Sequence, residues 1–501
     1  MTTTSAAPTT DATAAAAAAR ARWLALMVLC LGDLMIVLDG TIVNVALPSI
    51  RDDLGFSETS LAWVANGYLL TFGGFLLLGG RLGDLFGQRR MFLIGIVLFT
   101  AASIACGLSG TQELLVISRA VQGLGGALVS AVALSLLMTL FTEPAERAKA
   151  MGIFGFVLSG GGAAGVLLGG VLTDLLSWHW IFLVNVPVGI AVYLLCLRLL
   201  PATPPVAGGR IDAGGAVTVT GALVLAVYGI VNGNEAGWGS AQTLGLLGSA
   251  AVLLAAFLII ESRVPSPLVP LGLFRHRAVA AANIVGVLMA GGMFAWFFFS
   301  ALYLQQILGY TPLEVGLVYL PSMIVWGGSS LVSDKVVMRF GILPPLVAGL
   351  SLMTVGLLLF SRAPVDGSIL LDVIPGTLAI GLGAGIAFNP ILLAAMSGVG
   401  PAEFGLASGV VNTSFMMGGA VGLAIMASIA ASRTSALERA GDTDLVALNG
   451  GYHAAFLAGA LFTAAAAGIG LALLRRVSMA APDPHAAPEA APAGEPALRD
   501  G

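Results

Sequence analysis

Charged residues are scarce in this sequence. Only 10% of the 501 residues are Asp, Glu, Lys or Arg, whereas 58% are hydrophobic and the mean hydropathy is +0.98. Soluble domains carry roughly a quarter charged residues. Because so few charges cannot cover a surface that faces water, we expect an integral membrane protein.

Cysteine and histidine are also rare, and neither is arranged for chemistry. The three cysteines lie inside apolar runs, so the sequence predicts no disulfide framework. The four histidines are scattered without metal-ligand spacing. Nucleotide-binding loops and nucleophile motifs are missing as well. We therefore expect no enzyme activity, no metal, no cofactor and no nucleic-acid partner.

The chain does contain fourteen apolar runs, each long enough to cross a hydrocarbon core of about 30 Å. Spans in lipid must be helices, because an open sheet edge cannot satisfy its backbone groups there. The sequence therefore predicts an all-α integral membrane fold with 14 transmembrane helices. The runs are 23–46, 61–80, 91–108, 114–138, 150–172, 180–200, 213–231, 244–260, 279–304, 315–333, 341–360, 369–396, 404–431 and 454–474.

The basic residues outside these runs indicate an orientation. If the N-terminus is cytoplasmic, only Arg51, Arg362, Arg433 and Arg439 fall on the outer side. Inner loops are the ones that hold an excess of Lys and Arg. We therefore expect a multi-pass protein of a bacterial cell membrane, with both termini in the cytoplasm.

Short segments recur in the same order at an offset of about 250 residues. Residues 54–57 (LGFS) return as 308–311 (LGYT), 123–126 (GLGG) as 381–384 (GLGA), and 144–146 (PAE) as 401–403. Helices one to six then match helices nine to fourteen as two parallel repeats. We expect a disordered cytoplasmic tail (1–22), a six-helix half (23–200), two inserted helices with linkers (201–262), a second six-helix half (263–476) and a disordered tail (477–501).

Several motifs resemble one transporter family. Residues 80–90 (GRLGDLFGQRR) resemble the loop signature of the major facilitator superfamily. Residues 38–48 (LDGTIVNVALP), 119–123 (RAVQG) and 178–187 (WHWIFLVNVP) are similar to its fourteen-helix drug:proton antiporter branch. The fifth helix carries the glycines of that branch's packing motif, with Val166 where proline is usual. These glycines are Gly161, Gly165, Gly169 and Gly170.

The resemblance implies a conformational latch between the two halves. In the family, the loop Asp faces the N-terminus of a helix in the opposite half, where the helix dipole favours an anion. Here Asp84 would face the helix that starts near Phe404, and Asp334 would face the fifth helix. The expected latch residues are Gly80, Asp84, Gly87, Arg89, Arg90, Asp334 and Arg339.

Ionisable residues inside membrane spans are costly and mark function. The sequence places Asp33, Asp39 and Arg119 well inside spans, with Asp39 and Arg119 at similar depth. These two residues form either a pair that exchanges partners when a proton arrives or a static contact between helices one and four. Gln122 lies one turn beyond Arg119, and we include it in this predicted coupling site.

Asp33 points about 120° away from Asp39 on an ideal helix, and it shares its face with Asn44. That polar face suits a water-filled cavity, and Asp33 either binds cations or protons there or makes a buried polar contact. Phe294, Trp296 and Asn389 are candidates for a substrate wall in the second half. The alternative for the aromatic cluster 293–299 is contact with lipid.

These observations favour a secondary active transporter that exports small lipophilic or cationic compounds by proton antiport. The alternatives are a proton-coupled uptake symporter and a non-transporting sensor or channel. An uptake carrier for sugars should show more hydrogen-bonding residues on its cavity helices, and a sensor should carry a soluble output domain. The expected partners are a lipophilic small molecule, protons and membrane lipid. The proton gradient is the energy source, and we expect a monomer.

Overall fold

The computed structural model describes residues 10–200, 212–397, 399–400 and 404–475. Within these ranges every regular element is a helix, and fourteen helical segments are long and apolar enough to cross a membrane. The predicted all-α fold with fourteen spans is therefore confirmed. The helices are α1 (Thr10–Leu54), α2 (Glu58–Phe86), α3 (Gln88–Gly107), α4 (Gln112–Leu140), α5 (Pro144–Leu175), α6 (Trp180–Leu183), α7 (Asn185–Leu199), α8 (Ala213–Ala236), α9 (Ala241–Arg263), η1 (Leu271–Arg275), α10 (Arg277–Leu302), η2 (Tyr303–Ile307), α11 (Pro312–Phe340), α12 (Leu343–Phe360), η3 (Ile369–Val373), α13 (Ile374–Met396), α14 (Phe404–Ala440) and α15 (Asp444–Leu473).

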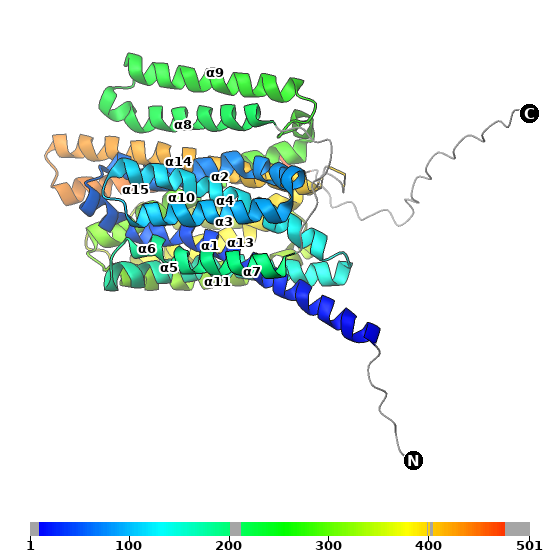
Figure 1. Cartoon of the computed structure of the whole chain (residues 1–501). Helices are drawn as coiled ribbons and strands as arrows, with labels where there is room; N and C mark the ends of the chain where they lie inside the picture. The colour runs from blue at the N-terminus through cyan, green and yellow to red at the C-terminus, as the bar shows by residue number, and fades with distance from the viewer. Residues whose placement is uncertain (1–9, 201–211, 398, 401–403, 476–501) are drawn as a thin grey trace, which may run out of the picture.

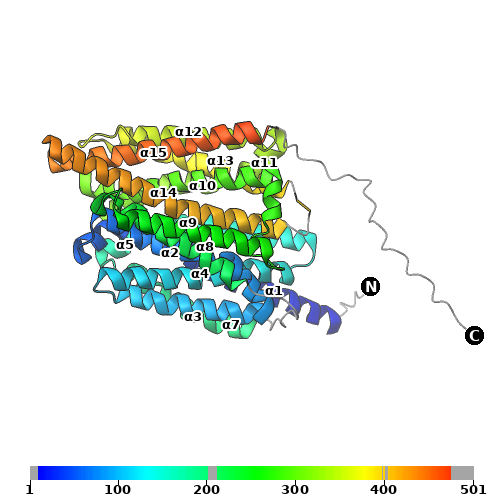
Figure 2. The same cartoon turned by 90° about the horizontal axis from the view of Figure 1, so that it is seen from above.

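The spanning helices run side by side along one direction (Figure 1). The described chain begins and ends at the same end of this bundle, which we call the terminal end; the opposite end is the far end. Helices α1–α7 form the first half and α10–α15 the second. Helices α8 and α9 form an extra layer over the seam where α2 meets α14 (Figure 2).

The repeated segments adopt the same local structure in both halves. Gly55 and Gly309 have positive φ angles of 70° and 73°, which glycine adopts without strain. Ser57 and Thr311 follow them, and each hydroxyl accepts a bond from the third backbone N–H of its helix in a capping box. The same turn therefore starts α2 in the first half and α11 in the second.

The beginning of α1 corrects one prediction. Residues 1–22 were expected to form a disordered tail, but α1 already begins at Thr10. The segment 14–19 consists of alanine, which has the highest helix propensity, so the helix extends beyond the apolar run. Residues 1–9 and the predicted tail at 477–501 lie outside the described residues.

The aromatic cluster of α10 is a second correction. Trp296, Phe298 and Phe299 are at most 2% exposed, so lipid contact is the wrong reading for them. The reason is that α13, α14 and α15 all pack against α10, which leaves it little free face. Trp296 meets the ring of Tyr319 edge-on, with ring centroids 5.5 Å apart, inside the second half.

Candidate functional site

Asp39 forms the centre of a buried polar network in the first half. Its side chain is completely buried, and Oδ2 accepts a hydrogen bond from Nη1 of Arg119 on α4. Its other oxygen, Oδ1, accepts bonds from Gln122 Nε2 at 2.6 Å and from Asn185 Nδ2 at 2.9 Å. Three helices, α1, α4 and α7, therefore meet on this one carboxylate.

Sequence reasoning missed two members of the network. Asn185 lies in the segment 178–187 that resembles the antiporter branch, but the sequence predicts no separate role for it, and it predicts none for Ser103 of α3. Ser103 Oγ accepts bonds from Gln122 Nε2 at 2.8 Å and Asn185 Nδ2 at 3.4 Å. The signal that could have found Asn185 is a lone amide inside an otherwise apolar run.

Arg119 has partners besides Asp39. Its Nη1 also donates to Gln122 Oε1 at 2.8 Å, and its Nε donates to the backbone oxygen of Val64 at 3.0 Å. The guanidinium lies over the ring of Tyr68, 4.4 Å from the centroid. These contacts would still stabilise the cation if the carboxylate of Asp39 were neutralised.

Asp33 lies apart from this network, as the helical angle predicts. It is 3% exposed and accepts a hydrogen bond at Oδ1 from the hydroxyl of Ser130 on α4. Its Oδ2 is buried without a hydrogen-bond partner in the described part of the chain, and Arg119 makes its ion pair with Asp39. The first half therefore holds two buried carboxyl groups in different environments.

The other predicted substrate positions are not gathered at one place. Asn44 donates to Gly40 and Thr41 in its own helix, both at 3.3 Å. Phe294 packs against Phe415 of α14, with centroids 6.1 Å apart. Asn389 donates to Asp334 Oδ1 at 2.9 Å.

The latch residues lie at the terminal end, and no hydrogen bond or ion pair of Asp84 or Asp334 within the described residues crosses between the halves. Asp334 bonds to Asn389 of α13 and not to α5. Among the described residues, Asp84 makes no hydrogen bond or ion pair; residues 401–403, just before the start of α14, lie outside them. Arg89 Nη2 donates to the backbone oxygen of Leu197 at 2.6 Å, within the same half.

The remaining predicted latch residues have local roles here. Gly87 separates α2 from α3 with a φ of 92°. The guanidinium of Arg339 lies 5.3 Å from the ring centre of Phe340, and Arg90 is exposed. At Gly80 an added Cβ would lie 3.9 Å from Ala131, so this position has little steric need for glycine.

The glycines of α5 allow close helix contacts. A Cβ at Gly161 would lie 2.8 Å from Leu34 of α1, one at Gly165 would lie 2.1 Å from Thr41 Oγ1, and one at Gly169 would lie 2.7 Å from the backbone oxygen of Ile42. Gly170 instead faces Pro312 of α11, at 2.6 Å. One row of glycines on α5 thus packs against α1. Gly170, near the end of α5, contacts the second half.

Helices α5 and α11 bring the two halves into close contact at the far end. At the far end Gly316 of α11 lies against the backbone of Val166. Toward the terminal end, a Cβ at Gly155 of α5 or at Gly328 of α11 would meet no atom of the described residues within 4 Å. The two halves are therefore in contact through α5 and α11 at the far end, whereas Gly155 and Gly328 have open space beside them nearer the terminal end.

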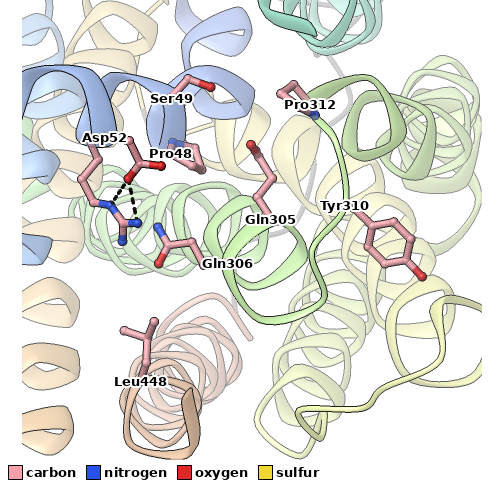
Figure 3. A pocket seen from close by; sticks show the side chains of 9 residues that line it. Pro48, Ser49, Asp52, Gln305, Gln306, Tyr310, Pro312 and Leu448 are labelled. Atoms are coloured by element: carbon pink, nitrogen blue, oxygen red, sulfur yellow. Dashed lines mark hydrogen bonds and ion pairs between the residues drawn. The ribbon is translucent and has the colours of Figure 1, made fainter. Parts of the chain in front are cut away.

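A small pocket of about 380 Å³ remains at the far end (Figure 3). It lies between the last two turns of α1, with Pro48 and Asp52, and η2, with Gln305 and Gln306. Gln305 Nε2 donates to the backbone oxygen of Val45 at 2.8 Å. This bond joins the two halves beside the pocket.

Comparisons with known proteins agree with this architecture. The chain is 40% identical over 419 residues to "Puromycin resistance protein pur8" of Streptomyces alboniger, covering 83% of each chain. It is 38% identical over 415 residues to "Cephamycin export protein CmcT" of Amycolatopsis lactamdurans, covering 82% of this chain and 85% of the relative. A solved structure described as an auto inhibited POT family peptide transporter has the same fold, with a TM-score of 0.65 at 16% identity, covering 92% of this chain and 99% of that one.

The sequence profile described as "Major Facilitator Superfamily" matches residues 29–423, which span most of both halves and the inserted helices. The relatives of this chain are transporters and not enzymes. The fourteen spans make this chain a multi-pass membrane protein. The chain therefore belongs to the Major Facilitator Superfamily of membrane transporters.

Proposed function

We propose that this chain exports small lipophilic or cationic compounds across a bacterial cell membrane in exchange for protons, with both termini in the cytoplasm. The names of its relatives support export, since one confers puromycin resistance and another exports cephamycin. The positive-inside rule supports the orientation. In this orientation the far end, where the two halves touch through α5 and α11, is the outer side.

The observation that carries proton coupling is the burial of Asp39. A carboxylate inside a membrane span is unfavourable unless it is paired or protonated. In the paired state Asp39 holds α4 and α7 against α1 through Arg119, Gln122 and Asn185. A proton arriving on Asp39 forms an O–H bond and removes the negative charge that binds Arg119.

Arg119 can then remain charged without Asp39, because Gln122 Oε1, the Val64 carbonyl and the ring of Tyr68 still contact it. Proton binding would thus weaken the contact of α1 with α4 without leaving a bare cation. Alternating access requires such a change in helix contacts. Asp33 would serve as a second titratable group, either in the proton step or in binding cationic substrates.

A resistance panel in an efflux-deficient host identifies a compound that the chain transports. That compound is then offered to everted membrane vesicles whose lumen is acidified. An exporter that exchanges substrate for protons accumulates the compound in the lumen, and an uncoupler abolishes the accumulation. Uptake symport predicts the opposite, because substrate would leave the acidic lumen together with protons.

A further inference from the structure

Two more buried carboxyl groups lie in the inserted helices, at the terminal end of the bundle. Asp212 precedes α8 and caps it, since Oδ1 accepts a bond from the backbone N–H of Gly215 at 2.7 Å. Glu261 lies in the last turn of α9. Each of the two acidic residues is 4% exposed. Both lie far from Asp39 in the sequence. Neither has a part in the coupling scheme above.

The free oxygens of the two groups converge. Asp212 Oδ2 and Glu261 Oε1 are buried, and neither has a hydrogen-bond partner among the residues that the structure describes. Both lie beside Gly215, where an added Cβ would be 2.7 Å from the first oxygen and 2.6 Å from the second. Ionised carboxylates can only accept hydrogen bonds, so two anions here would repel each other without a donor between them.

No positive charge compensates this pair among the described residues. Within the described ranges, the charged group that acts on Glu261 is Asp212. The basic or titratable side chains that follow in the chain, Arg263, Arg275 and His276, are exposed. An apolar cluster at this end of α8 contains Ala216, which follows Gly215, together with Leu78 of α2 and Leu268. One proton shared by the two carboxyl groups supplies both the missing donor and the charge balance.

The pair also fixes the linker between α9 and α10, residues 264–276. Glu261 Oε2 accepts a hydrogen bond from the backbone N–H of Val269 at 3.1 Å. Leu268 of this linker packs with Leu78 of α2 in the first half. Leu273 packs with Val410 of α14 in the second half. The linker therefore bridges the two halves at the terminal end.

The inserted helices bridge the same seam along their length. Thr220 of α8 packs closely against Gly74 of α2. A Cβ added at Gly74 would lie 2.0 Å from the hydroxyl oxygen Oγ1 of Thr220. At the other end of α8, Asn234 Nδ2 donates to the backbone oxygen of Ser428 on α14 at 2.6 Å. Any movement of α2 against α14 must therefore act on α8 and the linker.

We propose that Asp212 and Glu261 share one proton and form a proton-binding site, separate from Asp39, that holds the linker across the two halves. When the proton is bound, one carboxyl donates it to the other, and the Val269 contact is kept. When the proton leaves to water, two buried anions face each other, and Glu261 turns outward and releases Val269. This site depends only on the inserted helices and does not require the proposed export activity.

Infrared spectroscopy of the purified protein at neutral pH tests the shared proton. A protonated carboxylic acid has a C=O stretching band that carboxylates lack and that shifts in D₂O. We expect this band in the parent, and we expect part of it to be lost in both Glu261→Gln and Asp212→Asn. Glu438→Gln, which changes an exposed acid on α14, is the matched control and should keep the whole band.

Hydrogen exchange of the linker tests the clamp. Gln at position 261 can donate to Asp212 and still accept from Val269, so Glu261→Gln should keep the linker amides protected at every pH. In the parent, protection of Val269 should fall severalfold as the pH rises, after correction for intrinsic exchange. Gly215→Ala, which inserts a methyl group between the two oxygens, should lower protection at all pH values.

Two results would overturn the proposal. One is a parent spectrum in which neither Glu261→Gln nor Asp212→Asn changes the acid band, which would mean that both groups are ionised. The other is a linker whose corrected protection is the same at all pH values in the parent. Because neither measurement uses transport, a failure here is distinguishable from a failure of the export proposal.

Discussion

At the scale of single residues, the two membrane carboxylates differ in their hydrogen-bond partners. Asp39 accepts bonds from an arginine and two amides, whereas Asp33 has one hydroxyl donor and one buried oxygen with no partner among the described residues. A charge-assisted network favours the ionised form, and a single neutral donor favours it much less. We therefore expect different consequences when each residue is changed.

Asn185→Leu tests the part of the network that the sequence did not reveal. The change removes a donor to Asp39 and leaves a gap in its hydrogen bonding, which should lower the free energy of unfolding by about 1–3 kcal/mol. Gradient-driven export should fall several-fold. Asn283→Leu is the matched control, since the amide nitrogen of that buried asparagine donates to its own helix. Equal effects of the two changes on export would contradict a role for Asn185.

Asp33→Asn separates a functional carboxylate from a structural contact. Asn keeps the size of the side chain and can still bond to Ser130. If Asp33 binds cations or carries protons, export of cationic compounds should fall more than export of neutral ones, or the pH profile of export should change. The measurement is efflux of one cationic and one neutral compound over a pH series. Profiles identical to the parent for both compounds would make Asp33 a structural residue.

At the scale of helices, the sequence predicts the membrane spans and the turns that start them, because apolar length and local backbone geometry determine both. Fourteen spans followed from apolar length, and the Gly55 and Gly309 turns follow from the repeated segments before α2 and α11. The meeting of Asp39 with Asn185 was not predictable, because it depends on how α1 packs against α7, 146 residues away. The length of an apolar run shows that a helix spans the membrane, but it does not show which neighbouring helix this span contacts.

Gly165→Ala tests the close contact of α5 with α1. A methyl group at this position would lie 2.1 Å from Thr41 Oγ1 and 3.0 Å from the backbone oxygen of Leu38, so the helices must move apart. Overpacking of this kind costs about 1–3 kcal/mol. Gly162→Ala is the control, since no described atom lies within 4 Å of its added Cβ. We expect a lower melting temperature for Gly165→Ala only; equal temperatures would show that this contact can relax freely.

At the scale of the whole molecule, the two halves meet through α5 and α11 at the far end. The Gln305 bond to Val45 and the contact of Gly170 with Pro312 close the far end. The same chain must also adopt the opposite arrangement if it works by alternating access. In that arrangement Asp84 would face the start of α14, as the resemblance to the family predicts.

Asp84→Asn tests this latch. An anion at a helix N-terminus contributes about 0.3–1 kcal/mol, so its loss should shift the population toward the state that is open at the terminal end. Spin labels on cysteines that replace Gly155 and Gly328 report the separation of α5 and α11, because both positions have open space. Longer mean distances are expected in Asp84→Asn. Unchanged distances would leave Asp84 with a role in topology alone.

The most direct test of the central claim is proton movement in liposomes that contain only this purified chain. A substrate is added outside without an imposed pH gradient, and a dye reports the pH of the lumen. Antiport predicts that the lumen becomes alkaline as substrate enters, and that Asp39→Asn, although folded, gives no pH change. Acidification of the lumen, or an alkaline shift as large in Asp39→Asn as in the parent, would contradict proton antiport through Asp39.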